Sequence, residues 1–177
     1  SIGFNNPEFF EDVDGTDVEH LTRAQLEGKQ AVFRQLCFYQ KYMKGFENAY
    51  IAEIAPMVGV RESRNICTEY VVTAHDLLSR RKFPDAFCES NYPIDVHGKT
   101  LYFAEQESSD AGESPFFEIP CRSLMVKNVQ NLLVAGRCLG AEFLAQAAIR
   151  TQHTMRSSGE AAGILAALAV EQHAPVK

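Results

Sequence analysis

Two segments near the carboxyl end combine residue types that suit a planar, partly anionic ligand. In the first, residues 131–140, an apolar stretch leads directly into Gly136 and Arg137. Glycine lets the backbone come close to a ligand, and arginine supplies a fixed cation for a phosphate or a flat ring. A strand–turn–helix corner with a surface arginine would have the same sequence pattern. The segment therefore predicts either a binding turn or such a corner.

The second segment, residues 148–155, leads into a stretch of helical pattern that contains Gly159 and Gly163. The start of a helix presents unpaired backbone amides and the positive end of the helix dipole, which suit an anion or a carbonyl edge. Small residues keep one helix surface narrow, so that a sheet or a ligand can approach it. A tightly packed core helix has the same composition, and this structural alternative stays open.

Three other side chains could act on a substrate. His97 could move a proton during a reaction, because histidine titrates near neutral pH. Arg61 and Arg64 could each hold a substrate carboxylate through paired hydrogen bonds. The structural alternative is a histidine at a strand end and two solvated or ion-paired arginines. The sequence has no Ser–His–Asp spacing and no His-Glu-x-x-His motif, so nothing in it supports hydrolase or zinc-protease chemistry.

Composition limits the classes of function. The 177 residues are 46% hydrophobic and carry a net charge of −6, which argues for a globular protein and against a nucleic-acid partner. The longest apolar run, residues 161–170, is far shorter than the roughly 20 residues that span a bilayer. The five cysteines are odd in number and widely spaced, which indicates neither a disulfide framework nor a zinc site. Reduced thiols fit a cytoplasmic protein.

The candidate residues need helices and strands to position them. A capping box formed by Thr16 and Glu19 predicts the start of a long helix that ends near Phe46. Alternating and β-branched residues predict strands at 50–54, 65–72, 85–90, 92–97, 100–104 and 116–120. A short helix is predicted from Thr73. The apolar run 131–135 predicts a buried strand, and helices are predicted at 142–148 and 154–172.

These elements predict an α+β fold with two domains. Residues 1–126 would form a substrate-side domain, in which a mixed or antiparallel sheet of about four to six strands packs against the long amino-terminal helix. Residues 127–177 would add a strand and two helices that belong to an incomplete ligand-binding domain.

Taken in order along the chain, these segments resemble the bacterial FAD-dependent oxidoreductases. Chains of that family end in a strand with the sequence Asn-Leu-Leu-Val-Ala-Gly-Arg, a short helix, Ile-Arg, and a last helix rich in Gly and Ala. Residues 131–137, 149–150 and 157–163 follow this pattern. Six further motifs occur in the family's order, at residues 45–50, 54–56, 59–64, 81–86, 92–97 and 119–124.

The resemblance implies FAD as the cofactor, and hydride or two-electron transfer between a small-molecule substrate and the flavin ring. Ala135, Gly136 and Arg137 would lie beside the flavin or its ribityl-pyrophosphate. The segment that would approach the isoalloxazine ring consists of Arg150, Thr151, Gln152, His153, Thr154 and Met155. His97, Arg61 and Arg64 would lie on the substrate side. The family commonly has Pro-Thr where His153-Thr154 stands here, which puts the backbone path in doubt at that point.

The family's Gly-x-Gly-x-x-Gly segment, which binds the FAD pyrophosphate, does not occur among the eleven glycines. We therefore expect a carboxy-terminal fragment that binds FAD weakly or not at all by itself. Its partners would be the missing FAD-binding region and, through an exposed sheet edge, a second copy. Two alternatives stay open. The chain could be a stand-alone binding module of the same fold without cofactor, or half of an enzyme split over two polypeptides.

Overall fold

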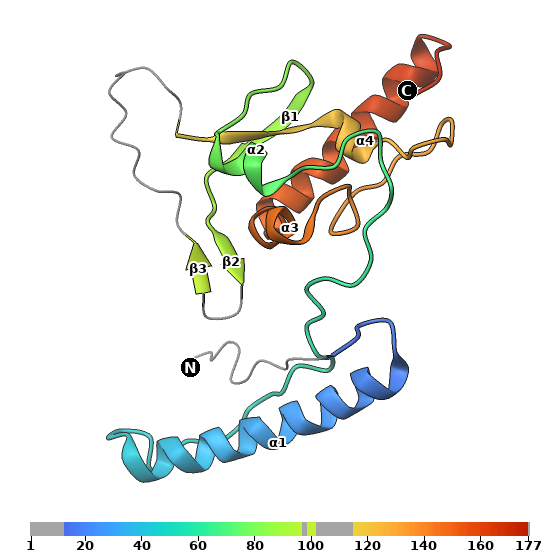
Figure 1. Cartoon of the computed structure of the whole chain (residues 1–177). Helices are drawn as coiled ribbons and strands as arrows, with labels where there is room; N and C mark the ends of the chain where they lie inside the picture. Colours follow the sequence, from blue (N-terminus) through green and yellow to red (C-terminus); the bar gives the residue numbers. More distant parts are fainter. Residues whose placement is uncertain (1–12, 97–98, 102–114, 177) are drawn as a thin grey trace. The chain divides into compact units, whose positions relative to one another are not determined.

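The computed structural model describes residues 13–96, 99–101 and 115–176 (Figure 1). Contacts within the chain divide it into two compact units, residues 1–63 and 64–177. The predicted boundary between residues 126 and 127 falls inside the second unit. The division into a substrate-side part and a flavin-side part therefore stays a prediction.

The first unit is built around α1 (Val18–Tyr42), which is the long helix that the sequence predicts. The predicted capping box is wrong by one residue. The Asp17 side chain caps the helix, accepting from the amides of Glu19 at 2.8 Å and His20 at 3.1 Å. Thr16 instead donates its amide to Asp14 Oδ1 at 2.8 Å. The helix ends at Tyr42 rather than near Phe46, because Met43 already has an extended backbone.

The segment after α1 does not form the predicted strand 50–54. Its backbone is bound by glutamine side chains of α1 rather than by another strand. Gln25 accepts from the Val58 amide at 2.6 Å and donates to the Pro56 carbonyl at 3.1 Å. Gln40 donates to the Ala49 carbonyl at 2.8 Å. These long-range side-chain bonds provide partners that the alternating pattern alone would assign to a sheet.

The described part of the second unit contains two small antiparallel sheets. β1 (Ala86–Ser90) pairs with β4 (Phe117–Pro120), and β2 (Ile94–Val96) pairs with β3 (Lys99–Leu101). The predicted strands 85–90 and 116–120 are confirmed. The predicted strands 92–97 and 100–104 are present as the β2–β3 hairpin, although residues 97 and 102–104 lie outside the described residues. The α+β class is confirmed. A single sheet of four to six strands is not found over the described residues, and its packing against α1 stays a prediction because the helix and the strands belong to different units.

Two predicted strands form only isolated bridges. Residues 65–72 contribute the bridges Thr68–Val126 and Val72–Ala141, while residues 131–135 contribute Met125–Leu133. The side chain of Leu132 is also exposed, so this strand is not buried as predicted. A strand with apolar residues on both faces needs neighbours on both sides, and the described residues supply a single bridge.

The helices of the second unit cover the sheets. α2 (Ala74–Leu78) packs against β4, α3 (Phe143–Ile149) against β2, and α4 (Gln152–Glu171) against β1 and η1 (Cys121–Leu124) (Figure 1). The larger side chains of the core between them are Val72, Leu77, Ile94, Phe117, Ile119, Leu124, Leu139 and Ile149. Within the described residues, no helix has both the length and the apolar character needed to cross a bilayer.

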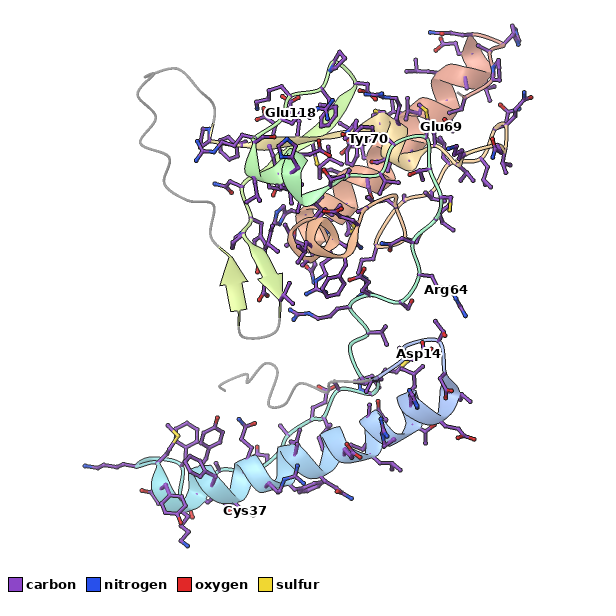
Figure 2. All side chains as sticks on the ribbon, viewed as in Figure 1. Asp14, Cys37, Arg64, Glu69, Tyr70 and Glu118 are labelled. Carbon is purple, nitrogen blue, oxygen red and sulfur yellow. The ribbon has the colours of Figure 1, made fainter. Side chains whose placement is uncertain are left out.

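A buried carboxylate links the segment that carries Tyr70 to α2. Asp76 is almost completely buried and accepts from the Tyr70 hydroxyl, from the Thr73 amide and hydroxyl, and from Arg81. The Thr73–Asp76 pair is a capping box for α2. The guanidinium carbons of Arg81 and Arg122 lie 5.8 Å and 5.3 Å from the centre of the Tyr70 ring, which Figure 2 labels. This polar network holds the predicted short helix in place.

Candidate functional site

The predicted binding turn at Gly136 has the backbone that its sequence suggests. Gly136 adopts a φ of 84°, in the left-handed region that favours glycine. Its carbonyl accepts from the Leu139 amide at 3.1 Å, which closes the turn. Its amide donates to Ser158 Oγ at 2.9 Å. The turn is therefore bonded directly to α4, although 22 residues separate Gly136 from Ser158.

Arg137 follows Gly136 and has an exposed side chain. Its backbone carbonyl accepts from Gln146 Nε2 at 2.6 Å. Gln146 lies on α3 and is fully buried, and its second amide atom, Oε1, has no hydrogen-bond partner among the described residues. The turn is thus held from α3 as well as from α4.

The start of α4 leaves its first amides without a side-chain cap. Thr151 is the N-cap residue, but its hydroxyl makes no capping hydrogen bond. Instead Thr151 Oγ1 lies 3.1 Å from Thr154 Oγ1 and 3.1 Å from His153 Nε2. Gln152 and His153 are exposed, Thr154 is buried and Met155 is half-buried. The helix begins two residues before the predicted Thr154, so His153 in place of proline does not prevent it from starting.

Arg150 connects the start of α4 to the predicted substrate-side hairpin. Its Nη2 donates to the Asp95 carbonyl in β2 at 2.9 Å. The structure therefore gives Arg150 a structural contact, which the resemblance did not imply. The contact joins two segments that are 55 residues apart in sequence, β2 and the residues just before α4.

Two glycines leave one side of α4 open. A Cβ atom added to Gly159 or Gly163 would meet no atom within 4 Å, and the same holds at Gly136. The exposed Arg137 and the first amides of α4, which have no side-chain cap, are donors of the kind that bind a flat, partly anionic ligand. The residues present fit a flavin nucleotide in this respect.

Two of the three predicted substrate-side residues lie within the described part of the chain, and they belong to different units. Arg61 is half-buried in the first unit, whereas Arg64 is exposed in the second, where its side chain points away from the ribbon (Figure 2). His97 lies outside the described residues. Their catalytic roles stay predictions.

Sequence reasoning missed the two residues that hold the turn, Gln146 and Ser158. Gln146 was the only polar residue in an otherwise apolar helical stretch, and that isolated position was the available signal. Ser158 had no comparable signal, because a serine within a run of small helical residues has no distinguishing pattern.

The comparison with protein families shows which family the chain belongs to. The model of the FAD dependent oxidoreductase family matches residues 2–177. The chain belongs to this family. No curated protein and no solved structure matches it. Membership of the family makes FAD the cofactor of the parent protein and redox chemistry its function.

Proposed function

We propose that the Gly136 turn and the start of α4 together hold the flavin of this oxidoreductase. The observation that carries the proposal is the 2.9 Å hydrogen bond from the Gly136 amide to Ser158 Oγ. It joins the Gly136 turn to the second turn of α4, the helix that begins within the other segment singled out for ligand binding. The Arg150 contact with the Asp95 carbonyl supports a substrate site beside them, since it ties the predicted substrate hairpin to the start of α4.

The chain's own residues would bind and orient the cofactor. Gly136 carries no Cβ, so a ligand can approach its backbone closely. The exposed Arg137 guanidinium supplies a permanent positive charge for a phosphate or for the electron-rich edge of the ring. The first amides of α4 can donate to a carbonyl edge. The bound flavin supplies the two-electron chemistry, and these residues fix where the substrate meets it.

The remaining parts of the site would come from outside these residues. Because the chain has no Gly-x-Gly-x-x-Gly, we propose that the segment binding the FAD pyrophosphate is supplied elsewhere in the full-length protein. This chain would then contribute the substrate side and the contacts to the flavin ring.

Flavin titration of the full-length protein and one variant tests the proposal. Arg137→Gln removes the cation and keeps a polar side chain of similar size. Loss of one charge-assisted contact should weaken FAD binding roughly 10- to 100-fold. Arg156→Gln removes an exposed arginine that lies on α4 and should leave the affinity near the wild-type value. A wild-type protein that binds no FAD, or equal affinities for the two variants, would contradict the proposal.

A further inference from the structure

We propose that Ser158 and Gln146 are positioning residues that hold the Gly136–Arg137 turn in the shape that receives the flavin. The proposal rests on the proposed function of this turn. Neither residue needs to touch the cofactor. Each acts through a backbone group of the turn, and each does so from a different helix.

Ser158 joins the turn to the first turns of α4 through one hydroxyl. Its Oγ donates to the Met155 carbonyl at 2.7 Å and accepts from the Gly136 amide at 2.9 Å. A hydroxyl has one proton and two lone pairs, so it can make both bonds at once. The Ser158 side chain is fully buried, whereas Gly136 is half-buried. Ser158 therefore links Gly136 to Met155, one of the residues predicted to approach the flavin ring.

Gln146 holds the other side of the turn. Its Nε2 donates to the Arg137 carbonyl at 2.6 Å, while its own backbone amide donates to the Glu142 carbonyl within α3. The side chain is fully buried, yet Oε1 has no partner among the described residues. Burying an unpaired carbonyl oxygen lowers stability. An apolar residue would avoid that cost, so stability alone does not explain a glutamine here.

The two contacts together fix the whole turn. The Gly136 amide is bound by Ser158, the Gly136 carbonyl by the Leu139 amide, and the Arg137 carbonyl by Gln146. With these groups bound, the left-handed backbone of Gly136 is held before any ligand arrives. A preformed turn binds its ligand without a further loss of conformational entropy, and a loosened turn must be ordered during binding.

A matched pair of serine variants tests the role of Ser158. Ser158→Ala removes the hydroxyl that binds the Gly136 amide, and Ser157→Ala makes the same change at the neighbouring position in α4. In the full-length protein, Ser158→Ala should weaken FAD binding roughly 5- to 10-fold, as expected for one lost hydrogen bond. Without flavin, exchange of the Gly136 amide with solvent deuterium should become faster by a similar factor. Ser157→Ala should change neither value.

The amide-exchange readout separates positioning from a general loss of structure. If Ser158 were merely structural, exchange would accelerate across the second unit and not selectively at Gly136. Gln146→Met, which keeps the side-chain length and removes the amide, provides a second variant should Ser158→Ala fail to fold, and it should weaken FAD binding by a similar factor.

The possible outcomes separate the two proposals. If the wild-type protein binds FAD but Ser158→Ala and Gln146→Met bind it as tightly as Ser157→Ala does, the positioning role is wrong and the flavin site stands. If the wild-type protein binds no FAD, both proposals fail.

Discussion

Replacing Asp76 by asparagine tests whether the buried carboxylate organises the second unit. One carboxylate oxygen accepts from the Thr73 amide at 2.9 Å and from the Thr73 hydroxyl at 2.8 Å, and the other accepts from Arg81 Nη1 at 3.0 Å. The Tyr70 hydroxyl lies 2.9 Å from each oxygen. Asparagine can keep the Thr73 bonds through its single oxygen. Its amide group must then face the Arg81 guanidinium, so a donor meets a donor.

The size of the effect follows from these contacts. Breaking a fully buried ion pair costs about 3–5 kcal/mol. The Asp76 side chain is only 2% exposed, but that of Arg81 is 52% exposed and keeps its contact with water after the change. We therefore expect Asp76→Asn to lower the free energy of unfolding by about 2–3 kcal/mol. This value lies between the cost of breaking a buried ion pair and the cost of losing a single charge-assisted hydrogen bond.

The same carboxylate makes this difference depend on pH. Burial raises the pKa of Asp76, but the hydrogen bonds from Thr73, Tyr70 and Arg81 together outweigh it, so the pKa lies below its ordinary value. A carboxyl group whose pKa is lowered by folding adds stability above its unfolded pKa of about 3.9. That contribution is lost as the pH falls through the folded value. The wild type and Asp76→Asn should therefore converge in stability below about pH 4.

Urea unfolding of both proteins at neutral and acid pH measures the two effects. The control is Glu89→Gln, because Glu89 pairs with Lys82 at 3.0 Å while both side chains are about half exposed. This surface pair should be worth less than about 1 kcal/mol. The reasoning is refuted if Asp76→Asn costs no more than Glu89→Gln at neutral pH, or if its cost does not shrink in acid.

Three further predictions concern backbone positions, and urea unfolding measures each of them. In Gly140→Ala the new Cβ would lie 1.6 Å from Thr68 Oγ1 and 2.8 Å from the Tyr70 carbonyl, so we expect a loss of more than about 3 kcal/mol. Gly163→Ala meets no atom and should stabilise α4 by about 0.5–1 kcal/mol, and equal effects at the two positions would contradict the packing described here. Arg80, just beyond α2, has a φ of 52°, so Arg80→Gly should raise stability by about 0.5–1 kcal/mol. A loss of stability in that variant would show that the arginine side chain contributes more than its backbone strain costs.

Local signals in the sequence predicted the elements whose partners lie nearby. Helix α2 follows from its capping box, and α3 and α4 follow from helical patterns that contain no strong breaker. The start of α1 was missed by one residue because Thr16 and Asp17 are both good capping residues and stand side by side. Pattern alone does not decide between two such neighbours.

These local signals could not predict contacts between residues that are far apart in sequence. The run 131–135 has a strand composition, but a strand exists only with partners, and here a single bridge joins Leu133 to Met125. Gln146 and Ser158, which form hydrogen bonds with the turn, were missed for the same reason. Gln146 lies nine residues from Arg137 and Ser158 lies 22 from Gly136, so no local periodicity reports either contact. The turn itself was predictable, because Gly136 and Arg137 are adjacent.

Hydrogen–deuterium exchange of the full-length protein, with and without added FAD, tests the flavin site most directly. The amides of residues 135–137 and 151–155 should exchange more slowly in the presence of FAD, because both segments would then contact the cofactor. The amides of α2, which takes no part in the proposed site, serve as an internal reference and should not change. Unchanged exchange in both segments, while the protein binds FAD, would contradict the assignment.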